Sequence, residues 1–283
     1  MVLASLREAL GLLVSLPVLW LTGLATGILG VTEILLNSSG GSFYAGRLAI
    51  LQLVILPFFL AGSLGAIRKG DGSPAAFLSS ARDGYFRVLL PLAVVLAAAI
   101  LTVFLVMIPA SLVTGGVLAG ASIVVPGVLV SFAFFTYFTD AAAILEERKV
   151  LDSIRRSVEF TIRHSWKVLL FYIVNLAILT AALILAVLAW SILLADQLLP
   201  LTQMNTTELA AITPGDLAGL IGPGGIWVTA AVAFLLLACC GTFVVAYRAC
   251  FFRRHGAAGA TQGDNGVIPA RGEYDEKGRW YKY

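Results

Sequence analysis

Residues 88–108 read VLLPLAVVLAAAILTVFLVMI, a stretch without a charged side chain that is apolar around its whole helical circumference. About 20 apolar residues in a helix cross the roughly 30 Å hydrocarbon core of a bilayer, and a helix without a polar face is typical of a membrane span. Five further stretches have the same character. The six predicted spans cover approximately residues 17–36, 48–67, 88–108, 116–139, 168–195 and 226–249. The sequence therefore predicts an all-α integral membrane protein with six transmembrane helices.

The composition of the chain agrees with a membrane setting. Hydrophobic residues make up 59% of the 283 residues and charged residues 12%, whereas a soluble domain carries about 25% charged residues. The mean hydropathy is +0.95. The net charge of +3 arises in the segments between spans, so it indicates topology and contact with lipid headgroups, not nucleic-acid binding.

The positions of the cations predict the orientation. All Lys and Arg residues except Arg47 fall around Arg7 or within 68–87, 148–167 and 248–282. Because Lys and Arg accumulate on the cytoplasmic side of a membrane, we expect a multi-pass protein of the cell (plasma) membrane with both termini cytoplasmic. A cleaved signal peptide is the alternative at the N-terminus; it fits poorly, since Glu8 follows Arg7 and the apolar run continues.

Two domains follow from this pattern, a six-span region at 1–255 and a C-terminal tail at 256–283. Residues 256–270 are rich in Gly and Ala and are typical of a flexible linker. Residues 274–283 combine aromatic and charged side chains. This terminus could dock on the inner face of the protein, form a hairpin about 276–278, or bind a cytoplasmic partner, and docking on the inner face is favoured.

Residues 145–167 are predicted to form an amphipathic helix in the inner membrane interface. Leu151, Ile154, Val158 and Ile162 recur at helical spacing, so we expect this stripe to face lipid or the other helices. The cations of this segment are candidates for binding lipid headgroups or a protein partner: Arg148, Lys149, Arg155, Arg156, Arg163 and Lys167. The alternative is a plain anchor, with ion pairs joining 148 to 152, 155 to 159 and 159 to 163.

A repeated unit is suggested by two loop ends. FRVLL at 86–90 matches WKVLL at 166–170, and each follows a short amphipathic segment and opens an apolar span. The repeat predicts units of one interfacial helix followed by two spans, and hence a second interfacial helix within 68–87. Glycines at 23 and 27 and at 116 and 120 permit close helix packing.

The external loop at 196–225 is long and interrupted by Pro and Gly. Short helices are predicted at 206–212 and 214–221. Two glycosylation sequons, at Asn37 and Asn205, fall on the predicted outside.

The chain offers little catalytic or metal-binding chemistry. His164 and His255 have no ligand at metal-binding spacing, so a solvated interfacial role is expected for both. Cys239, Cys240 and Cys250 suggest neither a disulfide nor a metal. No catalytic motif is present. We therefore predict no metal, no cofactor and no enzymatic activity.

Polar residues within spans are costly and often functional. Glu33 and Arg248 lie near span ends, where Arg248 is expected to snorkel toward the interface. Gln52 and Asn175 are left as candidates for hydrogen bonds between helices. The absence of a mid-membrane carboxylate disfavours transport coupled to protons.

Residues 140–147 (DAAAILEE), followed by SIRRS at 153–157 and WKVL at 166–169, resemble a recurring loop pattern. The pattern occurs in archaeal six-helix membrane proteins of uncharacterised role and in the related membrane domain that accompanies some glycerophosphoryl diester phosphodiesterases. The closing YDEKGRWY at 274–281 is similar to tails in the archaeal branch. The resemblance implies fold and setting only, because the phosphodiesterase activity belongs to a separate soluble barrel, and it carries over no functional residue.

Three functions remain open on the sequence. A non-catalytic scaffold or assembly component, with membrane lipids and a protein partner bound through 145–167 or the tail, is favoured by the sparse polarity of the spans. A transporter or lipid-handling protein is the alternative, and a cavity lined by Gln52, Asn175 and the region of Pro126 would promote it. An intramembrane enzyme is the third and has no candidate residues.

Overall fold

The computed structural model describes residues 2–114, 117–202, 205, 214–263, 272–274 and 280–282. Its helical elements are α1 (Val2–Ser15), the 3-10 turn η1 (Pro17–Leu19), α2 (Trp20–Ser38), α3 (Ser42–Lys69), α4 (Pro74–Thr114), α5 (Val117–Thr136), α6 (Thr139–Leu145), α7 (Val150–Arg163), α8 (Ser165–Leu193), α9 (Ala195–Thr202) and α11 (Pro214–Gly263). Two short strands, β1 (Gly272–Tyr274) and β2 (Trp280–Lys282), pair antiparallel. This pairing matches the hairpin alternative for the tail.

Six helical stretches are long and apolar enough to cross a membrane. They are Pro17–Ser38, Phe43–Lys69, Pro74–Leu112, Ala121–Leu145, Ser165–Leu193 and Gly219–Gly256. The predicted all-α fold with six spans is therefore confirmed, and the chain has the architecture of a multi-pass membrane protein.

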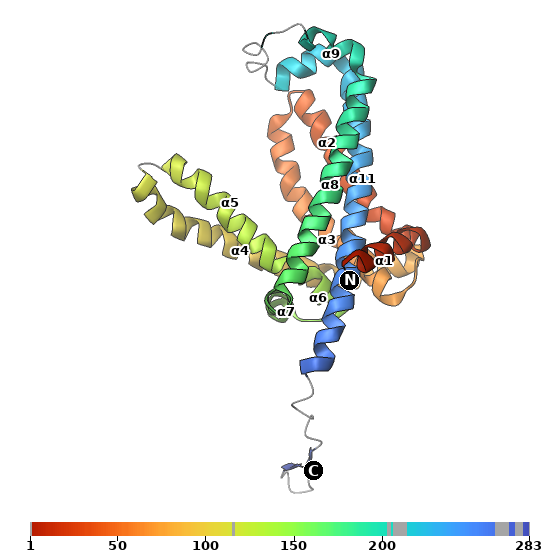
Figure 1. Ribbon diagram of the computed structural model, residues 1–283, viewed down its shortest axis with the longest axis vertical. Coiled ribbons are helices and arrows are strands. Elements are labelled where there is room, and N and C mark those ends of the chain that lie inside the picture. The colour runs from red at the N-terminus through yellow and green to blue at the C-terminus, as the bar shows by residue number, and fades with distance from the viewer. Residues whose placement is uncertain are drawn as a thin grey trace.

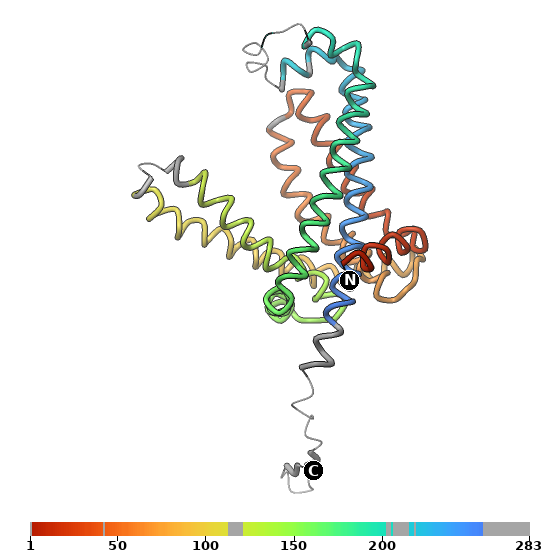
Figure 2. The backbone as a smooth tube through the Cα atoms, in the orientation of Figure 1, coloured from red at the N-terminus to blue at the C-terminus, as the bar shows by residue number. Residues whose placement is uncertain are grey.

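The six spans do not form a single bundle. Helices α2, α3, α8 and α11 run together, whereas α4 and α5 form a hairpin that diverges from them (Figure 1). The backbone trace shows the same fork (Figure 2). Helix α5 packs against α4 and, near its C-terminal end, against α7. We call the four helices the bundle, the α4–α5 pair the hairpin, and the place where they part the fork.

The bundle is drawn together by small residues on α2. A Cβ on Gly23 would lie 2.0 Å from the Ala238 carbonyl oxygen of α11, and one on Gly27 would lie 2.8 Å from the Phe234 ring. Thr22 adds a hydroxyl contact of 2.6 Å to Ser63 of α3. Close backbone approach at small residues is how helices associate in lipid, where burying apolar surface gains little. The predicted packing role of the glycine pair at 23 and 27 is thus confirmed, while Gly116 lies outside the described residues.

Helices α1, α6 and α7 gather at one end of the molecule, opposite α9 (Figure 1). An aromatic core fills this end: Phe138 is fully buried, and its ring centroid lies 5.0 Å from that of Phe160, 5.6 Å from that of Phe171 and 5.8 Å from that of Phe251.

The second interfacial helix predicted within 68–87 is not a separate helix. Residues from Pro74 onward are the first turns of the continuous helix α4, because nothing between the amphipathic segment and the span breaks the helical backbone.

A short helix at 214–221 is present as predicted. The backbone leaves helical geometry at Gly222, whose φ of 64° favours glycine, and Pro223 follows. The helix predicted at 206–212 lies outside the described residues.

Candidate functional site

The helix break between α5 and α6 organises the fork. Tyr137 and Phe138 interrupt the helical ladder and leave backbone groups that need partners. Ser157 of α7 satisfies two of them, because its hydroxyl donates to the Phe135 carbonyl at 2.8 Å and accepts from the Phe138 N–H at 3.1 Å. The Tyr172 hydroxyl of α8 donates to the Phe134 carbonyl at 3.2 Å. The break is therefore fixed by side chains from other helices.

An ion pair joins the base of the hairpin to the bundle at this break. Asp140, at the start of α6, pairs with Arg248 of α11, and their side chains are only 12% and 11% exposed. Arg248 also donates to the Tyr137 carbonyl at 3.3 Å and lies 5.1 Å from the centre of the Tyr137 ring. The other Asp140 oxygen accepts from the Ala141 N–H at 2.8 Å.

A cavity of about 240 Å³ opens beside this pair. Its walls come from α3, α4, α5, α6 and α11, so it occupies the fork itself. The lining residues are Leu60, Val88, Leu92, Val95, Ala133, Thr136, Tyr137, Thr139, Asp140 and Arg248. Leu92 and Ala133 are exposed, which places the mouth of the cavity between α4 and α5, on a surface that faces lipid in a membrane. We call it the fork cavity.

Two buried polar atoms of the fork cavity lack partners. The Arg248 Nε and the Thr139 hydroxyl make no hydrogen bond in the described part of the chain, although Arg248 is 9% and Thr139 6% exposed. A buried polar group without a partner costs about 1–3 kcal/mol. The cavity thus combines apolar walls with a neutral ion pair, and two of its lining residues carry a buried polar atom without a protein partner.

The candidates Gln52 and Asn175 are not brought together by the fold. Gln52 is half-buried and its side chain makes no hydrogen bond to another described residue, and Asn175 is buried with its side-chain oxygen unpartnered. Neither residue lines the well-formed cavities of the described chain, nor does Pro126. The arrangement that would have promoted a transport path through these residues is therefore not observed.

The cations of 145–167 occupy different surroundings. Arg148 and Lys149 line an open groove of about 720 Å³ together with Arg87 and the exposed apolar side chains of Phe86 and Leu151. Arg148 pairs with Glu146 at 3.2 Å instead of with the expected residue 152, because Glu146 projects from the turn before α7.

Arg155 and Arg156 of α7 differ in exposure. Arg155 pairs with Glu159 at 2.7 Å on the exposed face, as predicted. Arg156 is largely buried, binds Glu146 through two nitrogens at 3.0 and 2.9 Å, and donates to the Gly256 carbonyl at 3.2 Å. Arg156 thus holds the end of α11 and is not offered to a headgroup. Arg163 and Lys167 are exposed.

The apolar stripe of α7 is not the face that packs inward. Leu151 is 70% and Ile162 63% exposed, whereas Ser153, Ser157 and Phe160 are buried. The inward face combines the small hydroxyl residues Ser153 and Ser157 with Phe160. Ser157 approaches the helix break closely and supplies its hydrogen bonds, whereas Phe160 packs in the aromatic core.

The prediction of a solvated role was wrong for His255. His255 is 4% exposed, and its Nδ1 lies 3.1 Å from the Phe251 carbonyl oxygen. His164 is half-buried, and desolvation lowers its pKa. The two rings lie 6.4 Å apart, and no group of three or more metal-ligating side chains occurs among the residues that were placed. The three cysteines are free.

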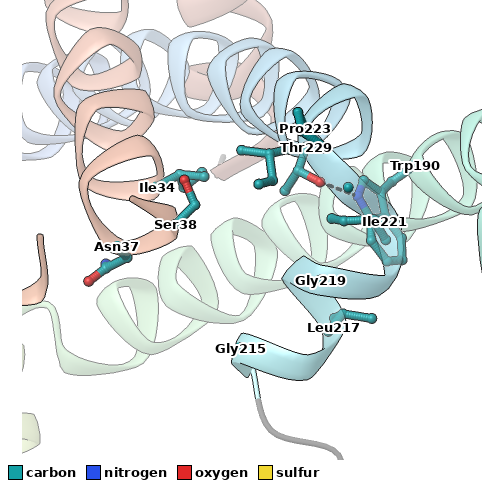
Figure 3. A pocket seen from close by; sticks show the side chains of 12 residues that line it. Ile34, Asn37, Ser38, Trp190, Gly215, Leu217, Gly219, Ile221, Pro223 and Thr229 are labelled. Atoms are coloured by element: carbon teal, nitrogen blue, oxygen red, sulfur yellow. Dashed lines mark hydrogen bonds between the residues drawn. The ribbon is translucent and has the colours of Figure 1, made fainter. Parts of the chain in front are cut away.

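A second, wider cavity of about 630 Å³ lies at the opposite end of the molecule (Figure 3). Ile34, Asn37 and Ser38 of α2 face Trp190 of α8 and the start of α11 across it. The Trp190 ring nitrogen donates to the Thr229 hydroxyl at 2.8 Å. The ring nitrogen of Trp190 is therefore satisfied within the protein.

Sequence reasoning missed the ion pair at the fork. Asp140 stood at the edge of a predicted span, and Arg248 was expected to snorkel. The available signal was one acidic and one basic residue, each embedded in an apolar run, since charges in such positions tend to pair. The helical stretch Ala121–Leu145 includes Asp140 near its C-terminal end, one residue beyond the span predicted at 116–139.

Comparison with known proteins defines the family of the chain. No curated protein and no solved structure matches it. Residues 1–255 match the model of a family described as a domain of unknown function, DUF7847. The match covers the six helical spans and the fork between them. The chain belongs to the DUF7847 family.

Proposed function

We propose that this protein is a lipid-handling membrane protein that holds one membrane amphiphile in the fork cavity. The observation that carries the proposal is an apolar cavity between α4 and α5 that is lined by the Asp140–Arg248 pair and by Thr139, and in which Arg248 Nε and Thr139 Oγ1 have no protein partner. An amphiphile could satisfy these atoms with its head while its chains lie against the hairpin. Water could also do so, but the apolar walls and lateral mouth favour a lipid.

The proposed orientation places the fork near the cytoplasmic leaflet of the cell membrane, with both termini inside. The cation clusters around α1 and α7 support it. In this orientation the groove, in which three cations (Arg87, Arg148 and Lys149) stand beside two acids (Glu147 and Asp152), lies at the layer of the headgroups. We therefore propose that the groove keeps α7 in the inner interface as an amphipathic helix, beside the entrance to the fork. The likeness to the phosphodiesterase-associated membrane domain stays an expectation.

The proposed role is non-catalytic and needs no cofactor. The Asp140 carboxylate is engaged by Arg248 and by a backbone N–H, so it is not free to act as a general base. Reaction chemistry would require a group poised at the mouth of the cavity, and the residues at that mouth are Leu92 and Ala133.

A scaffold function is the second candidate, and the hairpin favours it. Above the fork, α4 and α5 pack on each other and leave large apolar side chains such as Leu101 and Phe104 exposed. A membrane helix of another protein could cover this face. Lipid could cover it equally well, so the fork cavity gives the more specific argument.

Native mass spectrometry of the full chain released from a mild detergent tests the lipid-handling function. We expect one retained lipid per chain. Leu92→Trp should fill the cavity and lower lipid occupancy at least fivefold. Leu101→Trp is the matched control, because Leu101 lies on the same helix and is 61% exposed, and it should leave occupancy unchanged.

The lipid-handling proposal fails if the wild-type chain carries no lipid, or if Leu92→Trp and Leu101→Trp behave alike. A stoichiometric protein partner that co-purifies in place of lipid would support the scaffold.

A further inference from the structure

The geometry of the fork cavity points to the class of its ligand. We infer that the cavity takes the uncharged, oxygen-bearing head of a neutral lipid, of which diacylglycerol is the simplest example, in preference to a phosphate-bearing head. This inference rests on the proposed lipid-handling function and specifies the chemistry of the same site.

The first argument is the charge balance of the lining. The lining holds one acidic residue, Asp140, and one basic residue, Arg248, and their charges neutralise each other. A phosphate placed against Arg248 would also face the Asp140 carboxylate in surroundings of low polarity. Two like charges in close contact repel each other strongly when they are poorly solvated. A cationic head would likewise be repelled by Arg248. A neutral head avoids both.

The second argument is the type of hydrogen bond that is missing. The Arg248 Nε can only donate, whereas the Thr139 hydroxyl can donate or accept. Both atoms are buried and unpartnered. A ligand that reaches both atoms must therefore present an acceptor oxygen to Arg248 and a second oxygen, carbonyl or hydroxyl, to Thr139. A glycerol head with a free hydroxyl beside an ester carbonyl has both.

The third argument is depth. Arg248 lies five residues before Arg253, whose partly exposed side chain pairs with Glu8. Five residues correspond to about 7.5 Å along a helix, so the cavity lies deeper than the layer marked by Arg253. A phosphate head would lose hydration on moving to that depth, which costs several kcal/mol for an ion. An uncharged head loses far less.

The size of the cavity agrees with a small head. About 240 Å³ accommodates a glycerol-sized group but not a whole lipid. The chains must then leave through the mouth at Leu92 and Ala133 and lie on the lipid-facing surface of the hairpin.

Photocrosslinking of the full chain in lipid nanodiscs tests the inference. The probe is a diacylglycerol with a diazirine in one acyl chain, and labelled peptides are identified by mass spectrometry. We expect labelling of α4 and α5 near Leu92 and Ala133. Unlabelled dioleoylglycerol should compete at least tenfold better than dioleoylphosphatidylglycerol or dioleoylphosphatidylcholine, which share its chains.

Thr139→Val removes the hydroxyl with little change of volume and should lower labelling at the fork at least threefold. Thr102→Val is the matched control, because the Thr102 hydroxyl donates to the Ala98 carbonyl of its own helix at 2.8 Å. This control should label like the wild type.

The outcomes separate the inference from the proposed function. Labelling at the fork that dioleoylphosphatidylglycerol competes as well as dioleoylglycerol overturns the neutral-head inference and leaves lipid handling in place. Fork labelling that is indifferent to Thr139→Val also overturns the inference. If the diacylglycerol probe and a diazirine-bearing phosphatidylglycerol both fail to label the fork, the proposed function falls with it.

Discussion

The bundle and the hairpin are both built from apolar helices, yet α2 of the bundle and α5 of the hairpin differ in how closely they approach their neighbours. Helix α2 presents Gly23 and Gly27 to α11, where an added Cβ would collide with backbone or ring atoms. Helix α5 contains Gly127, around which nothing lies within 4 Å of an added Cβ. In lipid, apolar surface alone does not draw helices together, so small residues and hydrogen bonds decide which helices associate. Helix α4 makes such contacts with α3 near its start, where Gly62 and Gly65 of α3 approach Phe77 and Ser80. Farther along, α4 and α5 part from the bundle (Figure 1).

The joint between the two regions is the Asp140–Arg248 pair, and breaking one side of it should have the largest effect. Asp140→Leu leaves a buried guanidinium that cannot lose its proton, and we expect a loss of about 3–5 kcal/mol in stability. Thermal unfolding in detergent, followed by circular dichroism, measures it. The double variant Asp140→Leu with Arg248→Leu should regain most of the loss. If the double variant is as unstable as the single one, the ion pair is not the cause.

The difference in packing predicts opposite results for two glycine substitutions. Gly23→Leu should destabilise the bundle by about 3 kcal/mol, since the Ala238 carbonyl oxygen at 2.0 Å belongs to the backbone and cannot turn away. Gly127→Leu in the hairpin should leave stability unchanged or raise it slightly, because leucine favours the helix. The same thermal assay compares them. Equal losses at the two positions would show that the hairpin packs against something that Gly127 touches.

The hinge of the hairpin gives the smallest expected effect. Ser157→Ala removes the hydroxyl that serves the Phe135 carbonyl and the Phe138 N–H, at a cost of about 1–2 kcal/mol. Ser131→Ala is the control, since the Ser131 hydroxyl bonds to Gly127 within its own helix. Hydrogen exchange of the α5–α6 junction should rise for the first variant and not for the second. Unchanged exchange in both would mean that Ser157 does not hold the break.

Much of the fold could be predicted because spans and helical segments depend on local composition. The six spans and the helix at 214–221 follow from runs of apolar residues and from Pro and Gly signals. The close packing at Gly23 and Gly27 also follows from a local spacing. The continuity of α4 from Pro74 was missed, since an amphipathic segment and a span can share one helix without any break between them.

The site was harder to predict because its parts are far apart in the chain. Asp140 and Arg248 each resembled an ordinary charged residue near the end of a span. Ser157 resembled a residue without a specific role on an amphipathic helix. Gln52 and Asn175 seemed more promising because they stand deeper in their spans. A charge within an apolar run indicates that the residue needs a partner, but the neighbouring sequence does not identify that partner.

By itself, the sequence determined that the chain enters a membrane six times as helices, because the hydrophobic length of each span is a property of consecutive residues. Only the tertiary structure decided that α4 and α5 leave the other four, and that a buried ion pair with unmet hydrogen bonds stands where they part. Which helices pack together depends on whether two helix surfaces that are far apart in the sequence fit each other. That fit cannot be judged from either segment alone.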